Sequence, residues 1–348
     1  MRPFYRLEMK TSDTGSKSYY LIKDFRVKGT KGRVTKYIGT EEPNSQRIEE
    51  LSALHSSDIE LKVVEKKAEI SAKSYTTDIL PEENARDLIK ILERVKYIVL
   101  AFKGIMTTKE IEMYEEGLEI DYVHGTTSIE GNTMSRRETG TLLRDGIPPE
   151  NKTLREINEV QNFRNVSKYR NKYKGRVDVT FIKKLHAMIM NNIDLDGAGI
   201  FRRIDNIGIG GRDFMLTPWP MIEDELNEAI DDYYARVEVG HHPFIEAVRF
   251  HHTFERIHPF TDGNGRVGRE VLNYMLMRHD YPRLLFVKDR ALYLKALAEG
   301  DDGDHGGMTL TMADLMIEQR SDVAERNMKK LSEIVKRKGQ TRLIDFEP

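Results

Sequence analysis

The spacing of apolar residues divides the chain into a short β-rich start and a long helical remainder. Residues 18–28 and 33–38 are rich in β-branched and aromatic side chains and flank Gly29-Thr30-Lys31-Gly32, which predicts a β-hairpin. From residue 43 to about 76 the pattern becomes helical and charged, and residues 80 to about 289 follow it with one helix after another. In this long stretch apolar residues recur at helical spacing at Leu88, Leu92, Val95, Val99 and Phe102.

Capping signals mark helix starts in the helical part, and one predicted hairpin interrupts it. A Ser or Thr followed three residues later by Glu satisfies the free amides at a helix start, and three such pairs are Thr107 with Glu110, Ser135 with Glu138, and Thr153 with Glu156. Residues 207–217 interrupt the helices as a short hairpin, which Pro218 and Pro220 end. After Leu297 the pattern is loop-like and acidic through Asp304, and a charged helix follows.

These patterns predict a mainly α fold with a small hairpin-containing start. We expect four regions: an accessory part at 1–76, a helical part at 80–134, a catalytic core at 135–297 and a helical tail at 298–348.

Composition narrows the class of protein without fixing its function. The formal net charge is −2 and charged residues make up 32%, which is typical of a folded globular protein without a global attraction to nucleic acid. The absence of cysteine excludes disulfides, thiolate metal sites and cysteine nucleophiles. No stretch approaches eighteen uninterrupted apolar residues and no signal-type segment begins the sequence, so we expect a cytoplasmic protein without a membrane partner.

The predicted hairpin is locally basic. The first forty residues contain ten Lys or Arg against Glu8, Asp13 and Asp24. A nucleic-acid contact is one interpretation, but a solvated sheet whose lysines guard its edges is the one that we favour.

The stretch from His258 to Arg269 reads His-Pro-Phe-Thr-Asp-Gly-Asn-Gly-Arg-Val-Gly-Arg and concentrates chemistry that the rest of the chain lacks. The helix before it must break ahead of Pro259, and a second apolar pattern resumes at Val271. The stretch is therefore a loop that opens a helix, where free amides and the helix dipole favour anions.

Four residues of this loop suit a phosphate. Gly263 and Gly265 allow positive φ and close backbone approach, so that successive amides can point inward. Arg266 and Arg269 lie three apart on neighbouring positions of one helix face, where guanidinium groups can clamp phosphate oxygens.

Two further residues add a metal ligand and a base. Asp262 offers the hard carboxylate oxygen that Mg²⁺ prefers beside substrate phosphates and water. His258 is the one good general base of the stretch. Each residue alone has an ordinary structural explanation, but their combination within twelve residues predicts a nucleotide and magnesium site.

The stretch also resembles a known family. His-Pro-Phe-x-Asp-Gly-Asn-Gly-Arg-x-x-Arg is the full signature of the Fic family, and His258 to Arg269 matches every fixed position. The resemblance extends over roughly residues 80–297: Gly199-Ile200-Phe201-Arg202 and the hairpin after it look like the family's target-binding flap, and Arg290 with Tyr293 looks like its late core helix. The resemblance implies a target-binding role for Ile207, Ile209, Phe214, Met215 and Leu216.

Family members with this signature mostly transfer AMP from ATP to a protein hydroxyl. The resemblance implies that His258 deprotonates a target Ser, Thr or Tyr, that Asp262 holds Mg²⁺ on the α- and β-phosphates, and that Phe260 packs beneath the loop. An exposed hairpin edge could align an extended target segment as an added strand.

The resemblance also assigns the phosphate contacts. Asn264 and the amides of Gly263 and Gly265 would hold the α- and β-phosphates. Arg266 would steady the β-phosphate, and Arg269 would engage the γ-phosphate.

A second motif lies upstream, where Thr126-x-x-x-Glu130-Gly131 ends a helix predicted from Thr107. It resembles the inhibitory helix of Fic proteins, whose glutamate pairs with the second signature arginine, here Arg269. An Arg269 held by Glu130 could not clamp the γ-phosphate, so the enzyme would be autoinhibited. Glu130 could instead orient a water, which would make the same site a deAMPylase.

Other functions stay open at this point. Histidines at 241, 242, 251 and 252 with His279-Asp280 suggest a metal-dependent phosphohydrolase as an alternative. Against it, the histidines at 251, 252 and 258 fall on different faces of one helix, and no further acid completes the set. A nucleic-acid-binding regulator with a Fic-like scaffold is another class, and transfer of UMP, phosphate or phosphocholine is a third. The protein target is unknown, and self-modification and a homo-oligomer are both compatible with the sequence.

Overall fold

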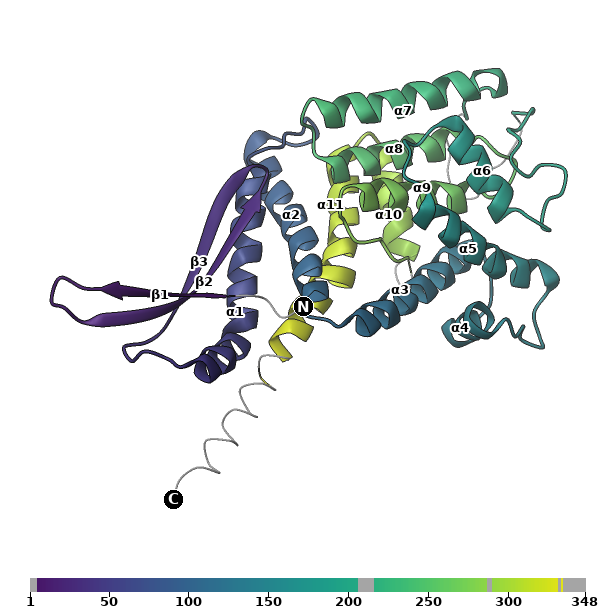
Figure 1. Cartoon of the computed structure of the whole chain (residues 1–348). Coiled ribbons are helices and arrows are strands. Elements are labelled where there is room, and N and C mark those ends of the chain that lie inside the picture. Colours follow the sequence, from purple (N-terminus) through teal and green to yellow (C-terminus); the bar gives the residue numbers. More distant parts are fainter. Residues whose placement is uncertain (1–4, 206–215, 287–289, 331–332, 334–348) are drawn as a thin grey trace. The chain divides into compact units, whose positions relative to one another are not determined.

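The computed structural model describes residues 5–205, 216–286, 290–330 and 333 (Figure 1). The chain forms two compact units that do not follow its linear order. The first unit combines Met1–Tyr75, Glu82–Ile111 and Ile317–Pro348, and the second combines Thr76–Pro81 with Glu112–Met316.

The first unit contains an antiparallel sheet in the order β1-β2-β3, from β1 (Arg6–Thr11), β2 (Lys17–Val27) and β3 (Thr30–Gly39). The pairing of Val27 with Thr30 closes the predicted hairpin through Lys28 and Gly29, both at positive φ, as tight hairpin turns require. The hairpin prediction is confirmed, while β1 was not predicted.

One face of the sheet packs on α1 (Ser45–Ala72), which confirms the helical pattern expected from residue 43. The shared core consists of Tyr5, Leu21, Val34, Leu51, Ile59 and Val63. Helix α2 (Glu82–Gly104) lies against α1, and the short π-helix η2 (Ile317–Ser321) lies against α2. The predicted stripe from Leu88 to Phe102 is buried in α2, as expected for a core-facing helix side.

The regular elements described in the second unit are helices, joined by loops and one isolated bridge between Thr76 and His241. Its elements are α3 (Thr108–Ile129, from Glu112 onward), α4 (Arg136–Asp145), α5 (Leu154–Lys172), α6 (Val179–Ile189), η1 (Trp219–Met221), α7 (Ile222–Glu238), α8 (Pro243–Ile257), α9 (Asn264–Arg278), α10 (Arg290–Asp301) and α11 (His305–Met316). Helix α9 is buried along nearly its whole length and packs against α8 and α6. It is therefore the central helix of this unit.

The helix starts follow the predicted capping pairs. Ser135 and Thr153 both form complete capping boxes. In each, the cap hydroxyl accepts a hydrogen bond from the backbone amide of the glutamate three residues later, and the glutamate side chain accepts one from the backbone amide of the cap residue. The Thr107 amide likewise donates to the Glu110 carboxylate at 2.7 Å. One local expectation was wrong: α10 runs on to Asp301, so the acidic segment before Asp304 is mostly helix rather than loop.

The mainly α fold with a small β-containing start is confirmed. None of the helices described is both long enough and apolar enough to cross a lipid bilayer. The predicted flap hairpin lies largely outside the described residues, including Ile207, Ile209, Phe214 and Met215, whereas Leu216 is described and half-buried.

Candidate active site

The loop between α8 and α9 has the geometry expected of a helix that stops and restarts. His258 ends α8 in the left-handed region, at φ 50° and ψ 60°, directly before Pro259. Gly263 begins α9 at φ 80°, where a side chain would be strained. Gly265 lies within the first turn of α9 instead, so only the first of the two expected glycines uses positive φ.

The loop is locked from inside by Asn264. Its side-chain oxygen accepts from the Phe260 amide at 2.8 Å, and its amide nitrogen donates to the Phe260 carbonyl at 2.7 Å. Phe260 is fully buried beneath the loop, as the family resemblance implied. Because both polar groups of Asn264 are engaged with Phe260, its side chain fixes the loop rather than pointing to a phosphate.

His186 on α6 supports the same loop. Its ring stacks on Phe260 with centroids 3.7 Å apart, its Nδ1 accepts from the Gly199 amide at 2.7 Å, and its Nε2 donates to the Asp262 carbonyl at 2.9 Å. Burial lowers the pKa of His186 to about 4, since the hydrogen bond to Asp262 only partly offsets the cost of a buried cation. The neutral ring of His186 therefore supports the loop, a role that the sequence did not predict.

Arg202 joins the segment before residue 206 to the loop. Its side chain is fully buried, and its Nε donates to the His258 carbonyl at 2.8 Å. Its backbone amide donates to the Pro259 carbonyl at 2.9 Å, and its Nη2 donates to the carbonyls of Ile257 at 3.2 Å and Thr217 at 2.5 Å. The sequence analysis quoted Arg202 only as part of a resemblance, and its buried position is what reveals this role.

The side chain of His258 is oriented for base chemistry. Its Nδ1 lies 3.3 Å from the Glu255 carbonyl, which can only accept, so Nδ1 carries the proton of the neutral ring. Nε2 is then the basic nitrogen. This tautomer is the one that a general base requires at that atom.

Asp262 lies between two arginines. Its Oδ2 accepts from Arg155 Nη2 at 2.5 Å, and its Oδ1 accepts from Arg266 Nη2 at 3.0 Å and from the Gly263 amide at 2.6 Å. Burial raises the pKa of this carboxyl, but the Arg266 charge, the Arg155 bond and the Gly263 amide outweigh it, so the net pKa is lowered. An ionised carboxylate that is 41% exposed fits an Mg²⁺ ligand whose remaining partners are phosphates and water.

Arg266 is almost fully buried at 1% exposed, and its guanidinium divides between two carboxylates. Nη2 binds Asp262, while Nη1 lies 3.2 Å from Glu159 Oε1 on α5. Glu159 Oε2 also accepts from the Asn132 side chain at 2.9 Å. Arg266 is therefore fixed in place before any phosphate arrives.

Arg269 meets the upstream motif. Its Nε donates to the Thr126 hydroxyl and its Nη2 to the Thr126 carbonyl, both at 2.9 Å, and Nη2 also binds Glu130 Oε1 at 2.7 Å. Arg269 is 1% exposed and lies near the rings of Phe286 and Tyr293. Glu130 thus pairs with Arg269 as the motif predicted, and Thr126 adds two contacts that were not predicted.

The Glu130 carboxylate also approaches the loop backbone. Burial raises the pKa of Glu130, but the charge and hydrogen bond of Arg269 lower it by more. The net pKa is therefore below its usual value, and the carboxylate is ionised at neutral pH. A Cβ on Gly265 would come within 2.5 Å of Glu130 Oε1 and 2.9 Å of Arg269 Nη1. A side chain at position 265 would therefore displace the ends of the Glu130 and Arg269 side chains, and Gly131, at φ 95°, turns the chain away after α3.

The histidines considered for a phosphohydrolase do not converge. His242 bonds to Tyr281, His251 to Tyr293 and His252 to Asp301. Among the described residues, the one close set of metal-type ligands is Asp78, His241 and Glu246. Arg236 pairs with both of its acids, at 2.6 Å from Asp78 and 2.7 Å from Glu246, so a guanidinium already supplies the positive charge.

Comparison with known proteins agrees with this geometry. Residues 176–276 match the Fic/DOC family. Protein adenylyltransferase fic-1 of Caenorhabditis elegans is 31% identical over 189 residues, which cover 53% of this chain and 37% of that protein. Protein adenylyltransferase Fic of Drosophila willistoni is 30% identical over 188 residues, with the same coverage. The chain thus matches little more than a third of the length of these curated relatives.

Solved structures show the same fold. A Fic domain-containing signaling protein from Bacteroides thetaiotaomicron aligns with a TM-score of 0.57 at 20% identity, over 71% of this chain and 98% of that one. A fragment of Fic-1 from C. elegans aligns with a TM-score of 0.56 at 20% identity, over 83% and 92%. Residues 176–276, which include the signature loop, therefore form a region of the Fic/DOC family, and the fold around them is shared with solved Fic structures.

Proposed function

We propose that this chain is a protein adenylyltransferase, which transfers AMP from ATP to the hydroxyl of a Ser, Thr or Tyr in a protein target. The observation that carries the proposal is the loop from His258 to Arg269, which holds a base, a carboxylate and two arginines around the start of one helix. The relatives named protein adenylyltransferase support the same activity.

In the proposed reaction, Nε2 of His258 takes the proton of the acceptor hydroxyl. The oxygen attacks the α-phosphorus, a new P–O bond forms, and the bond from the α-phosphorus to the bridging oxygen breaks. Pyrophosphate leaves with the electron pair of that bond, and the proton stays on His258 until solvent removes it. A well-placed base contributes about 10²- to 10⁴-fold to such a step.

The remaining groups bind and orient the nucleotide. The amide of Gly265 lies in the first turn of α9, where free N–H groups can stabilise phosphate oxygens, whereas the Gly263 amide donates to Asp262. Asp262 would hold Mg²⁺, which neutralises phosphate charge when bound. Arg266, fixed by Glu159, would present its guanidinium to the β-phosphate.

Arg269 and Glu130 form the proposed regulatory contact. In this pairing the Nε and Nη2 groups of Arg269 are bound to Thr126 and Glu130, so these two groups are not available to a γ-phosphate. We propose that the paired arrangement is the inactive state. Removing the Glu130 charge would then free Arg269 for ATP.

Differently labelled nucleotides test the proposal. Glu130→Gly protein given ATP labelled in the α-phosphate should acquire label, and ATP labelled in the γ-phosphate should transfer none. A matched Glu130→Gly/His258→Ala protein should remain unlabelled with both. Transfer from the γ-position would replace the proposal with a kinase, and preferential labelling by UTP would change the nucleotide. Loss of AMP from a prelabelled protein, dependent on Glu130, would identify a deAMPylase.

A further inference from the structure

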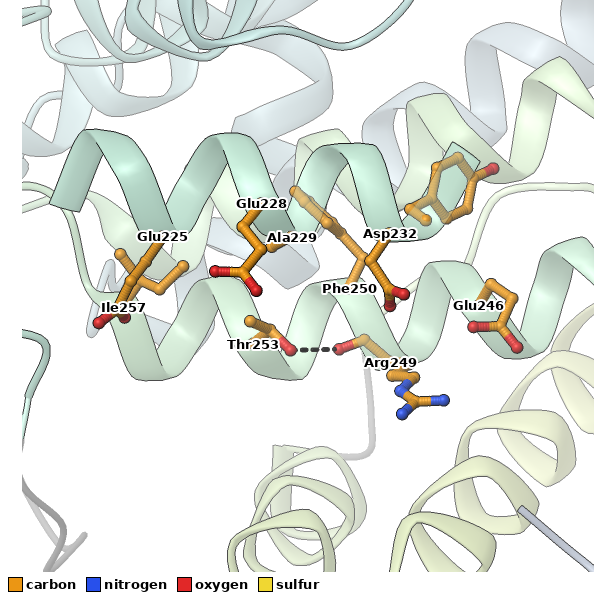
Figure 2. A pocket seen from close by; sticks show the side chains of 10 residues that line it. Glu225, Glu228, Ala229, Asp232, Glu246, Arg249, Phe250, Thr253 and Ile257 are labelled. Atoms are coloured by element: carbon orange, nitrogen blue, oxygen red, sulfur yellow. Dashed lines mark hydrogen bonds between the residues drawn. The ribbon is translucent and has the colours of Figure 1, made fainter. Parts of the chain in front are cut away.

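A groove runs between α7 and α8, and one of its ends is lined by Ile257 at the end of α8 (Figure 2). The two helices are joined by only a few residues and pack closely along their length. The cavity between them is about 400 Å³ in volume. Its lining includes four carboxylates, those of Glu225, Glu228, Asp232 and Glu246.

The carboxylates share one face of each helix. Glu225, Glu228 and Asp232 are spaced three and four residues apart, so α7 presents them as one row. Arg249 of α8 is the one basic residue of the lining. Helix α7 as a whole carries seven acidic residues, with Arg236 as its one basic residue.

Two of these carboxylates have no countercharge among the residues that the structure describes. Glu246 is paired with Arg236 at 2.7 Å, and Glu225 accepts from the Thr217 hydroxyl at 2.5 Å. In the part of the chain that the structure describes, neither Glu228 nor Asp232 forms an ion pair, and both are exposed. Neighbouring like charges without a partner favour a cation from outside.

A second observation points to a ligand. Tyr233 lines the same cavity and is 3% exposed, yet its hydroxyl has no hydrogen-bond partner among the described residues. Leaving a buried hydroxyl unpaired is costly, so such groups normally have a protein or water partner. A polar group that enters the groove would satisfy it.

The position of the groove links it to catalysis. One end is lined by Ile257, and the next residue in the chain is His258. From Ile257 to Glu246, eleven residues of helix span about 16 Å. An extended peptide rises about 3.3 Å per residue, so the groove has room for about five residues beside the acceptor.

We propose that this groove binds a basic segment of the protein target, with Lys or Arg within about six residues of the hydroxyl that His258 deprotonates. The inference rests on the proposed function and adds the class of substrate. Glu228 and Asp232 supply the attraction, and the Tyr233 hydroxyl offers a hydrogen bond to the bound segment.

A peptide series tests the groove in the full chain. Each peptide has one central threonine and carries lysine, alanine or glutamate at each position up to six residues away on either side. Labelling by Glu130→Gly protein should be about tenfold more efficient in kcat/KM with two lysines than with alanines, because a partly screened ion pair contributes up to roughly fivefold. The preference should shrink from ~0.05 M to ~0.5 M salt.

Matched variants locate the effect. Glu228→Gln/Asp232→Asn removes two charges from the groove, and Asp231→Asn/Glu238→Gln removes two from exposed positions of α7 that do not line it. The first variant should lose the lysine preference through KM and keep self-labelling, while the second should keep both. An unchanged preference in Glu228→Gln/Asp232→Asn would overturn the inference.

Direct binding separates this inference from the proposed function. Fluorescence anisotropy of the lysine-rich peptide should show about tenfold weaker binding to Glu228→Gln/Asp232→Asn than to the control variant, whether or not AMP is transferred. Equal binding to the two variants refutes the groove. Groove-dependent binding without labelling of any peptide or of the protein itself refutes the transferase instead. Equally tight groove binding by spermidine would show a small polyamine site and overturn the peptide inference.

Discussion

Replacing Glu130 with glycine should raise ATP-dependent self-labelling by about 10- to 100-fold. The bond from Arg269 Nη2 to Glu130 Oε1 is 2.7 Å long and joins a guanidinium that is 1% exposed to a carboxylate that is 29% exposed. A hydrogen bond to a charged group contributes about 1.5–3 kcal/mol, and ~1.4 kcal/mol corresponds to a tenfold change in population. The partial exposure of Glu130 favours the lower part of this range.

The assay compares initial rates of label incorporation from α-labelled ATP in three variants. Glu130→Gln keeps the size and an oxygen acceptor but removes the charge, so it should give an intermediate rise. Glu112 lies on the exposed side of α3. Glu112→Gly weakens the same helix without touching Arg269, so it should give no rise in the rate of labelling. A rise as large for Glu112→Gly as for Glu130→Gly would mean that loosening α3, and not freeing Arg269, releases the enzyme.

Thermal unfolding gives an independent check. Without Glu130, Arg269 keeps its two bonds to Thr126 but stays buried without a countercharge, so the variant should melt at a lower temperature than the wild type. ATP with Mg²⁺ should restore more stability to Glu130→Gly than to wild type, because only the released arginine can bind the γ-phosphate. Equal stabilisation of both proteins would contradict competition for Arg269.

Three further predictions concern neighbouring contacts. Desolvation opposes ionisation of Glu119, but Arg283 and Arg170 prevail and lower its pKa to about 2; Glu119→Gln should therefore cost about 3 kcal/mol at pH 7, and in denaturant titrations this difference should vanish as pH falls from 4.5 to 2. Arg202→Lys should lower kcat at least roughly tenfold but leave ATP binding by calorimetry unchanged, since lysine cannot reach several carbonyls at once; weaker ATP binding at an unchanged kcat would argue against it. A chelator should abolish labelling, and in Glu130→Gly protein Arg155→Gln should lower the Mg²⁺ needed by up to roughly fivefold, because Arg155 competes for Asp262; an unaltered Mg²⁺ requirement would show that it does not.

Local signals in the sequence predicted the elements well. The hairpin of β2 and β3 was readable because its strands alternate around a turn rich in glycine, and the helix starts were readable because capping is a contact between residues three apart. Strand β1 escaped prediction because it is short and charged, and it exists through its pairing with β2.

The site was predictable where its residues are neighbours in the chain. His258, Asp262 and the two arginines fall within twelve residues, so one turn and one helix start bring them together. Glu130 was predictable only through a resemblance, because 139 residues separate it from Arg269. His186 had no signal in the sequence, since a single histidine in an apolar helix is usually an ordinary core residue.

The sequence by itself therefore determined most of the secondary structure, the mainly α class and the chemistry of the loop, because these depend on residues within a few positions of one another. Only the tertiary structure decided which other residues contact the residues of that loop. It engaged Asn264 with Phe260, placed Arg155 on Asp262, made Arg202 a buried support and lined the groove between α7 and α8 with acids. Such contacts join distant segments, and they form only when burial of the core brings those segments together.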